Sequence, residues 1–292
     1  MRHQRCLPFL LALALCSFAP GCAFSNWCSQ RFGPPAAPCV LRDDSTQADV
    51  VNHLNDNTKK LLSWRATRAF IKIHGQGIID PPKVGAMIAV ESPRNFRLVA
   101  STPLGNEADL GSNQEHFWFW NKHNEEKYVY QAQHDLEPER MRRFPFPFQP
   151  DWIMESLGVI EIDTQQPLTM QPGPAGSHIV FLTADRLSPQ GLKVRKVTAV
   201  DLCLGVVREH ALYDARGDLI ARAVLRDHAH FRNIRNNGQD VVLPRAIDLE
   251  WPQAKLNLTM TFSEIEVNPE NISRGTWDVP KIRDYPIRDM TQ

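Results

Sequence analysis

The amino-acid sequence predicts a mainly β protein with a few helices, organised around one large curved antiparallel sheet. Three observations carry this prediction. About eleven segments alternate apolar and polar residues with the period of two that is typical of strands. Turn-forming sequences such as DARGDL, at 214–219, separate neighbouring segments. A helix-like segment precedes all the strands, and neither an internal repeat nor a second domain boundary interrupts them. We therefore expect the strands to pair in meander order.

The elements are expected in the following order along the chain. The first helix is expected within 45–64, where Ser45 and Thr46 are candidate N-caps and apolar residues recur at helical spacing. The second is expected at 150–158, where Gly158 is a suitable C-terminal cap. The expected strands are 68–75, 84–92, 95–101, 116–120, 127–133, 178–184, 193–201, 205–214, 219–228, 245–251 and 255–267. In the last of them, apolar residues alternate strictly with Asn, Thr and Ser, which predicts one dry face and one wet face.

One expected strand has large aromatic residues on both faces. Phe117 and Phe119 point to one side of a strand, and Trp118 and Trp120 to the other. Both pairs are buried only if something covers the sheet on each side. The Phe pair is the better candidate for the inner side because it has no N–H group to satisfy. Alternatively, one pair is partly exposed to water.

The charge of the chain limits its function class. Lys and Arg together number 33, as do Asp and Glu, so the formal net charge is zero. A nucleic-acid-binding protein would need a basic surface, so no nucleic-acid partner is expected.

The first 21 residues are typical of a signal peptide. A basic start at Arg2 and Arg5 precedes an apolar run that is too short to span a membrane comfortably. Gly21 and Cys22 then resemble a bacterial lipobox, in which cleavage leaves a lipid-bearing cysteine, although Ala19 departs from the usual Leu or Val. We expect Cys22 to carry the lipid; the alternative is a plain secretory signal.

The residues after this cysteine predict a tether. Residues 22–44 contain the Pro- and Gly-rich sequence RFGPPAAP, which disfavours packing, and the single folded domain is expected to be 45–292. Cys28 and Cys39 are candidates for a disulfide in an oxidising compartment, and whether they pair is left open. Cys203 lies in an apolar stretch and is interpreted as a small buried residue.

A Phe-Pro loop fits neither a helix nor a strand. Phe144, Phe146 and Phe148 alternate with prolines, which excludes a central strand and a helix interior. The loop is expected either to plug one end of the core or to act as a lid or membrane-contacting loop.

The order of the elements resembles the bacterial lipoprotein-localisation (Lol-type) carrier and receptor superfamily, and within it the uncharacterised lipoprotein-sorting-like lipoproteins. The resemblance covers about residues 46–275 and is carried by short sequences. These are LLSWRATRAFIKI, GAMIAVESPRNFRLVA, GSNQEHFWFW, LYDARGDLIARAVL and FSEIEVNPENI. The tail from Trp277 and the Phe-Pro loop have no counterpart in that pattern. The resemblance implies an unclosed barrel, lidded by helices, that shelters acyl chains.

We accordingly expect a non-enzymatic, monomeric lipoprotein that faces the periplasm, preferentially on the outer membrane. It would bind lipid or lipoprotein acyl chains, without cofactor or metal, as a receptor in lipoprotein sorting. The alternative is a sensor or scaffold of the same fold that binds a partner protein. The expected ligand cavity consists of Ile71, Ile88, Phe96, Leu98, Phe117, Phe119, Leu258 and Met260. His228 and His230 share a strand face but lack an evident third metal ligand.

Overall fold

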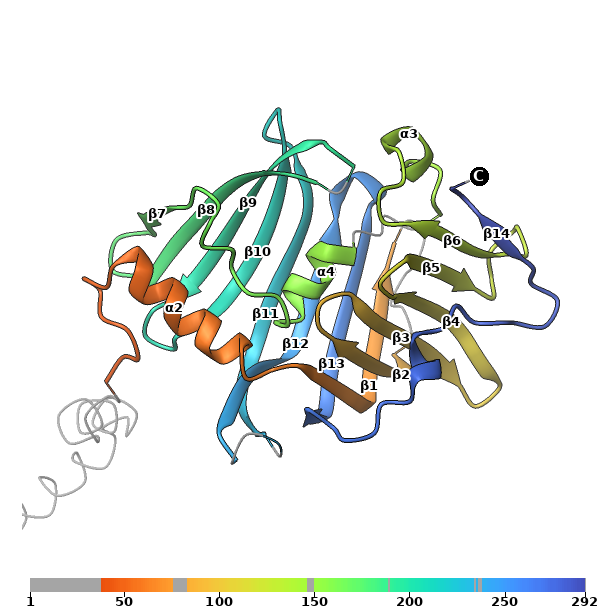
Figure 1. Cartoon of the computed structure of the whole chain (residues 1–292), viewed down its shortest axis with the longest axis horizontal. Helices are drawn as coiled ribbons and strands as arrows, with labels where there is room; N and C mark the ends of the chain where they lie inside the picture. The colour runs from red at the N-terminus through yellow and green to blue at the C-terminus, as the bar shows by residue number, and fades with distance from the viewer. Residues whose placement is uncertain are drawn as a thin grey trace, which may run out of the picture. The chain divides into compact units, whose positions relative to one another are not determined.

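The structure is a computed structural model that describes residues 38–75, 83–145, 150–188, 190–233, 235 and 238–291. The unit Cys39–Gln292 is compact, and its described strands form one sheet with the order β14-β6-β5-β4-β3-β2-β1-β13-β12-β11-β10-β9-β8-β7. Neighbouring strands are antiparallel except for the parallel pair of β14 and β6. The two ends of the order do not pair, so the predicted fold class, an open curved sheet with a few helices, is confirmed (Figure 1).

Eleven of the strands lie where the sequence pattern predicts them. The strands are β1 (Ser63–His74), β2 (Val84–Glu91), β3 (Asn95–Thr102), β4 (Gly105–Ser112), β5 (His116–Asn121), β6 (Val129–Gln133), β7 (Thr169–Pro172), β8 (Ile179–Leu187), β9 (Lys193–Asp201), β10 (Val206–Asp214), β11 (Leu219–Arg232), β12 (Asp240–Trp251), β13 (Leu256–Val267) and β14 (Ile287–Asp289). The pattern misses β4, which is rich in residues that strands disfavour, and the short strands β7 and β14.

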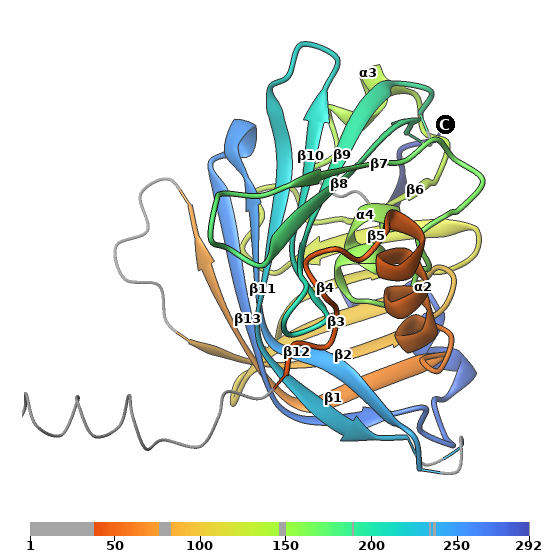
Figure 2. The ribbon, with the colours of Figure 1, turned by 90° about the vertical axis from the view of Figure 1, so that its left-hand side faces the viewer.

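The helices lie on the concave side of the sheet or at its rim. They are α2 (Gln47–Thr58), α3 (Pro138–Met141) and α4 (Pro150–Ser156), with 3-10 turns η1 (Pro252–Ala254) and η2 (Arg274–Trp277). Figure 2 shows α2 and α4 on the same side of β11, β12 and β13. None of the helices in the described part of the chain is long and apolar enough to cross a membrane.

Helix α2 is shorter than its apolar pattern predicts. Thr46 and Asp49 form a capping box that starts it. It ends at Thr58, and the side chain of Asn268 binds the backbone between this end and the start of β1. That amide accepts hydrogen bonds from the N–H groups of Leu62 and Ser63, at 2.9 and 3.0 Å. A contact from so far along the chain leaves no local signal in the helix sequence.

The C-terminal segment explains why β5 has aromatic residues on both faces. Phe117 and Phe119 belong to the main core on the concave side. Trp118 and Trp120 form a second, small core on the outer side, together with Val129. Residues of the C-terminal segment, namely Val279, Ile282 and Tyr285, pack against this outer core. The tail therefore acts as an outer layer over β4, β5 and β6.

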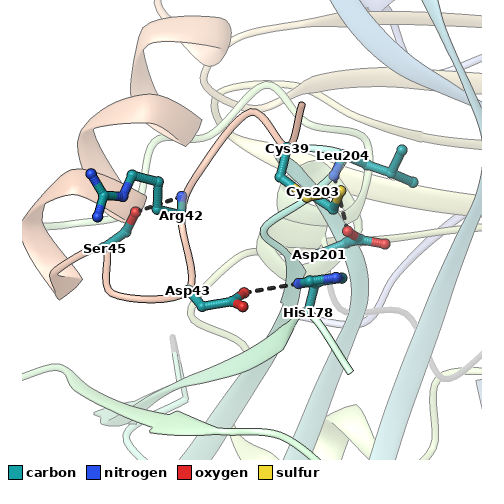
Figure 3. Close-up of a disulfide and its surroundings, with 8 residues drawn as sticks. All are labelled: Cys39, Arg42, Asp43, Ser45, His178, Asp201, Cys203 and Leu204. Atoms are coloured by element: carbon teal, nitrogen blue, oxygen red, sulfur yellow. Dashed lines mark hydrogen bonds and ion pairs between the residues drawn. A yellow bond between two sulfur atoms is a disulfide. The ribbon is translucent and has the colours of Figure 1, made fainter. Parts of the chain in front are cut away.

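The beginning of the folded unit corrects three sequence interpretations. Cys39 forms a disulfide with Cys203, so it is not available to Cys28, which lies outside the described residues. Cys203 occupies the turn between β9 and β10 and is only partly buried, which replaces its interpretation as a buried strand residue (Figure 3). Leu41 donates a backbone hydrogen bond to Leu202, so residues 39–44 belong to the folded unit rather than to the tether.

Candidate functional site

The eight residues predicted to line a ligand cavity lie together on the concave side of the sheet. All belong to one hydrophobic cluster and none is more than 7% exposed. They come from five strands: β1, β2, β3, β5 and β13. Sequence alternation therefore identified a common face, and the structure brings its members into a single core. Side chains of the protein fill much of the space on this face. That it binds a ligand stays a prediction.

Helix α4 supplies many of the side chains that occupy the concave side. Trp152, Ile153 and Met154 are at most 3% exposed and pack in the same cluster as the predicted cavity residues. Leu157, which directly follows the helix, is also buried there. Its carbonyl accepts a hydrogen bond of 3.1 Å from the indole N–H of Trp64 on β1. The helix thus covers the inner surface of the sheet like a lid.

The Phe-Pro loop contributes one described residue to this core. Phe144 is buried, and its ring centroid lies 4.9 Å from that of Phe117. This contact fits the interpretation of the loop as a plug. Phe146 and Phe148 lie outside the described residues, so the alternative role of lid or membrane contact stays a prediction.

An ion-pair cluster attaches α4 to the sheet. Glu155 on the helix is buried and pairs with Arg186 on β8 and with Lys196 on β9, at 2.7 Å for the lysine. Burial alone would raise the pKa of the Glu155 carboxyl, but the two cations outweigh it and lower that pKa to about 2. The helix lid is therefore held to the strands by charge as well as by apolar packing.

A buried histidine lies beside this cluster. His210 on β10 is fully enclosed, and its Nδ1 is 3.0 Å from the hydroxyl of Thr198 on β9. Burial lowers the pKa of His210 to about 3, with a further contribution from the positive charge of Lys196. The imidazole is therefore neutral at physiological pH.

A small cleft opens between α4 and the sheet. It has a volume of about 70 Å³. Its lining is formed by Pro150, Asp151, Trp152, Arg186, Ser188, Gln190, Leu192, Val194, Leu212 and Ile220. The indole Nε1–H of Trp152 is buried and has no hydrogen-bond acceptor among the described residues. The cleft is lined by six apolar residues and by four polar ones, namely Asp151, Arg186, Ser188 and Gln190.

No sequence pattern indicates the polar residues around the helix lid. Glu155, Arg186 and His210 come from α4, β8 and β10, and nothing in their spacing predicts that they meet. The only local signal is Glu155 itself, a carboxylate among the apolar residues of WIMESL. A charged residue on the apolar side of a predicted helix calls for a buried partner.

The residues near the disulfide do not form a metal centre. Cys39, His178 and Cys203 are the one group of three potential ligands found in the described part of the chain, with ligand atoms within 4.8 Å of one another. Both sulfurs are engaged in the disulfide, so neither is a thiolate ligand. His178 instead contacts Asp43 at 2.8 Å, and this hydrogen bond raises the pKa of the imidazole (Figure 3).

Comparisons with known proteins find similarity in fold only. No protein-family description and no curated protein matches the chain. A crystal structure of a DUF1329 family protein from Desulfovibrio piger matches 78% of this chain and 95% of its own, with 10% identity and a TM-score of 0.49. A LolA superfamily protein from Nitrosomonas europaea matches 80% of this chain and 98% of its own, with 7% identity and a TM-score of 0.49. At these identities the likeness is one of fold.

Proposed function

We propose that this protein is a non-enzymatic lipoprotein of the cell envelope that binds an acyl chain on the concave side of its sheet, beneath helix α4. The acyl chain belongs to a lipid or to an acylated protein, as a receptor in lipoprotein sorting would require. The lipid on Cys22 anchors the chain to a membrane facing the periplasm, preferentially the outer membrane. The observation that carries the proposal is the apolar cleft between α4 and β8–β11, which borders the main core.

The size of the cleft sets a condition on binding. Its volume of about 70 Å³ corresponds to about two water molecules at roughly 30 Å³ each. A longer acyl chain therefore needs α4 to move away from the sheet. The surface beneath the helix is apolar, because Trp152 and Met154 pack there against the core. Acyl methylenes would replace those side chains in contact with the strands.

The hydrophobic effect is large enough to drive such an exchange. Each methylene removed from water contributes about 0.8 kcal/mol, so ten contribute on the order of 8 kcal/mol. Part of this is offset by ordering the chain and by exposing side chains of the helix. The unsatisfied Nε1–H of Trp152 gains an acceptor when a carbonyl oxygen reaches it.

A displacement titration tests the proposal. A fluorescent fatty acid that responds to its environment is bound to the wild-type chain and displaced with unlabelled fatty acid. Leu192, at the rim of the cleft, is 52% exposed, so Leu192→Glu is expected to leave the fold intact. The new charge at the opening is expected to weaken binding by about tenfold or more. Leu204 is 55% exposed but lies in the β9–β10 turn, so Leu204→Glu is the matched control.

The second candidate function is a scaffold or sensor that binds a partner protein. The filled concave core favours it, because the described side chains leave little empty volume there. The titration separates the two functions. A wild-type chain that binds no fatty acid supports the scaffold, and equal binding by both Glu variants rules out the cleft as the site.

A further inference from the structure

One edge of the sheet is left partly unpaired. Strand β7 is the last in the sheet order, and its four residues pair with residues 180–183 of β8. Strand β8 continues to Leu187, so its residues 184–187 have β9 on one side and, among the described residues, no strand on the other. In Figure 1, β7 lies at the left-hand margin of the sheet. The open edge therefore begins beyond the pair of Thr169, the first residue of β7, and Thr183.

The sequence before β7 explains why pairing stops. Thr169 pairs with Thr183, so continuing that register would place Pro167 opposite Asp185. Proline has no N–H to donate to the ladder, and it disfavours further pairing. The preceding residues separate from β8, and Gln166 and Asp185 line a common cleft. The open edge is thus a consequence of Pro167.

Four backbone groups face this edge without a partner. Ser188 donates a hydrogen bond of 2.8 Å to Leu192, which directs its peptide groups toward β9. Antiparallel strands alternate this direction from one residue to the next. The N–H and C=O groups of Asp185 and Leu187 therefore point away from β9. No partner for them occurs among the described residues, so an added strand would find a ready template.

The cleft along this edge contains one cation that no carboxylate of the described residues neutralises. Its volume is about 1070 Å³. Its charged lining residues are Asp185, Arg186, Lys193, Arg195, Asp214 and Arg216. Arg186 pairs with the buried Glu155, Arg195 pairs with Asp185, and Arg216 pairs with Asp214 and Asp218. Lys193 has no carboxylate partner among the described residues. Leu187 beside it is 64% exposed. The lining therefore offers both an unpaired cation and an apolar contact to an incoming chain.

We propose that the free edge of β8 binds an acidic, extended segment of a partner protein as an added strand. Backbone hydrogen bonds to Asp185 and Leu187 provide the pairing, and the unpaired Lys193 favours an acidic chain. A second copy of this chain would bring the same unpaired cation to the interface, so charge disfavours self-pairing. This site lies outside the cleft beneath α4 and goes beyond acyl binding.

The test uses two capped hexapeptides of alternating residues, Glu with Val and Lys with Val, added to the wild-type chain. Isothermal titration is expected to show the acidic peptide binding about tenfold more tightly or better. Hydrogen exchange is expected to slow at the amides of Asp185 and Leu187. Lys193→Glu is expected to weaken binding about tenfold, whereas Lys281→Glu, an exposed control in the C-terminal segment, is expected to have no effect.

A backbone variant tests the mode of binding. Leu187→Pro removes an N–H that points away from β9, and is expected to abolish binding of the acidic peptide. If this variant misfolds, the acidic peptide with N-methylated Val residues gives the same test on the wild-type chain. Equal affinity for both hexapeptides, unchanged binding of the N-methylated peptide, or protein dimers formed through this edge would overturn the proposal.

Discussion

Gly111 on β4 is a residue whose small size the outer layer requires. A Cβ atom at this position would overlap the indole ring of Trp118 on β5. That indole is fully buried and donates a hydrogen bond of 2.9 Å to Asp109, so it has little room to move. The residue pair therefore fixes how closely β4 and β5 can pack on this side.

We predict that Gly111→Ala destabilises the protein by about 2–3 kcal/mol, as overpacking of a rigid site does. Gly85→Ala is the control, because a Cβ there meets only the carbonyl oxygen of Ser101 at 3.4 Å. Urea unfolding measures both variants. Equal stability of the Gly111 variant and the wild type would show that the outer layer repacks freely.

His210 gives stability a specific dependence on pH. Its pKa is lowered by burial to about 3, from 6.5 in the unfolded chain. The unfolded chain therefore binds more protons between these values, and stability falls as the pH drops through this window. We predict a loss on the order of 3 kcal/mol between pH 6.5 and pH 4 from this group. Protonation of Glu155, whose pKa is lowered to about 2, affects stability mainly below pH 4.5.

Replacing His210 isolates this effect. His210→Asn keeps an acceptor for the Thr198 hydroxyl and is expected to flatten the dependence of unfolding free energy on pH in that window. His178→Asn is the control, because the pKa of His178 is raised by Asp43 and its contribution has the opposite sign. If the unfolding free energy of the His210→Asn variant depends on pH as in the wild type, His210 is not the group responsible for this dependence.

At the scale of elements, α4 is held to the sheet by a buried carboxylate. We predict that Glu155→Gln lowers the unfolding free energy by about 3–5 kcal/mol, since Arg186 and Lys196 then lose their buried partner. It should also speed acyl binding, because the helix lid opens more readily. Asp185→Asn breaks an exposed pair with Arg195 and is expected to change stability little. Stopped-flow fluorescence and urea unfolding measure the two effects. A Glu155→Gln chain that binds no faster shows that opening of α4 does not limit binding.

The elements also differ in how far the sequence predicts their burial and their contacts. Alternation in β13 identified the inward face of Leu258 and Met260 correctly, because a half-buried strand carries its burial pattern in its residues. The partner of Cys39 could not be found in this way, since Cys203 lies 164 residues away and only the fold brings them together. The ion pairs of Glu155 are hidden for the same reason. Whether the concave face is open depends on where α4 docks, which no local pattern records.

At the scale of the whole molecule, the covering of both sheet faces depends on segments distant in sequence. The strands and their common inner face follow from periodicity. The expected meander order holds only within β1–β6 and within β7–β13, because β1 pairs with β13 while β6 and β7 lie apart in the sheet order. The burial of Trp118 and Trp120 follows from the C-terminal segment, whose residues have no strong strand or helix pattern. The sheet and the burial of both aromatic pairs were therefore predicted, whereas the residues of the C-terminal segment that cover the outer pair were not.

Anchoring is a further property of the whole chain. Cys22 lies outside the described residues, and its lipidation stays a prediction from Gly21 and Cys22 in the sequence. We predict that Cys22→Ser either releases the protein into the soluble periplasmic fraction or leaves its signal peptide uncleaved. Cys28→Ser is the control and should remain with the membranes. A processed Cys22→Ser chain that still sediments with membranes contradicts lipid anchoring.

The central claim is that an acyl chain lies between α4 and the concave face. Photo-crosslinking tests this most directly, with a fatty acid that carries a diazirine at its terminal carbon and mass spectrometry to locate the labelled residues. We predict labels on core residues beside the cleft, such as Trp152 and Leu212, and competition by unlabelled fatty acid. Labels confined to exposed residues of other regions, such as Phe70 and Met87, would contradict the claim.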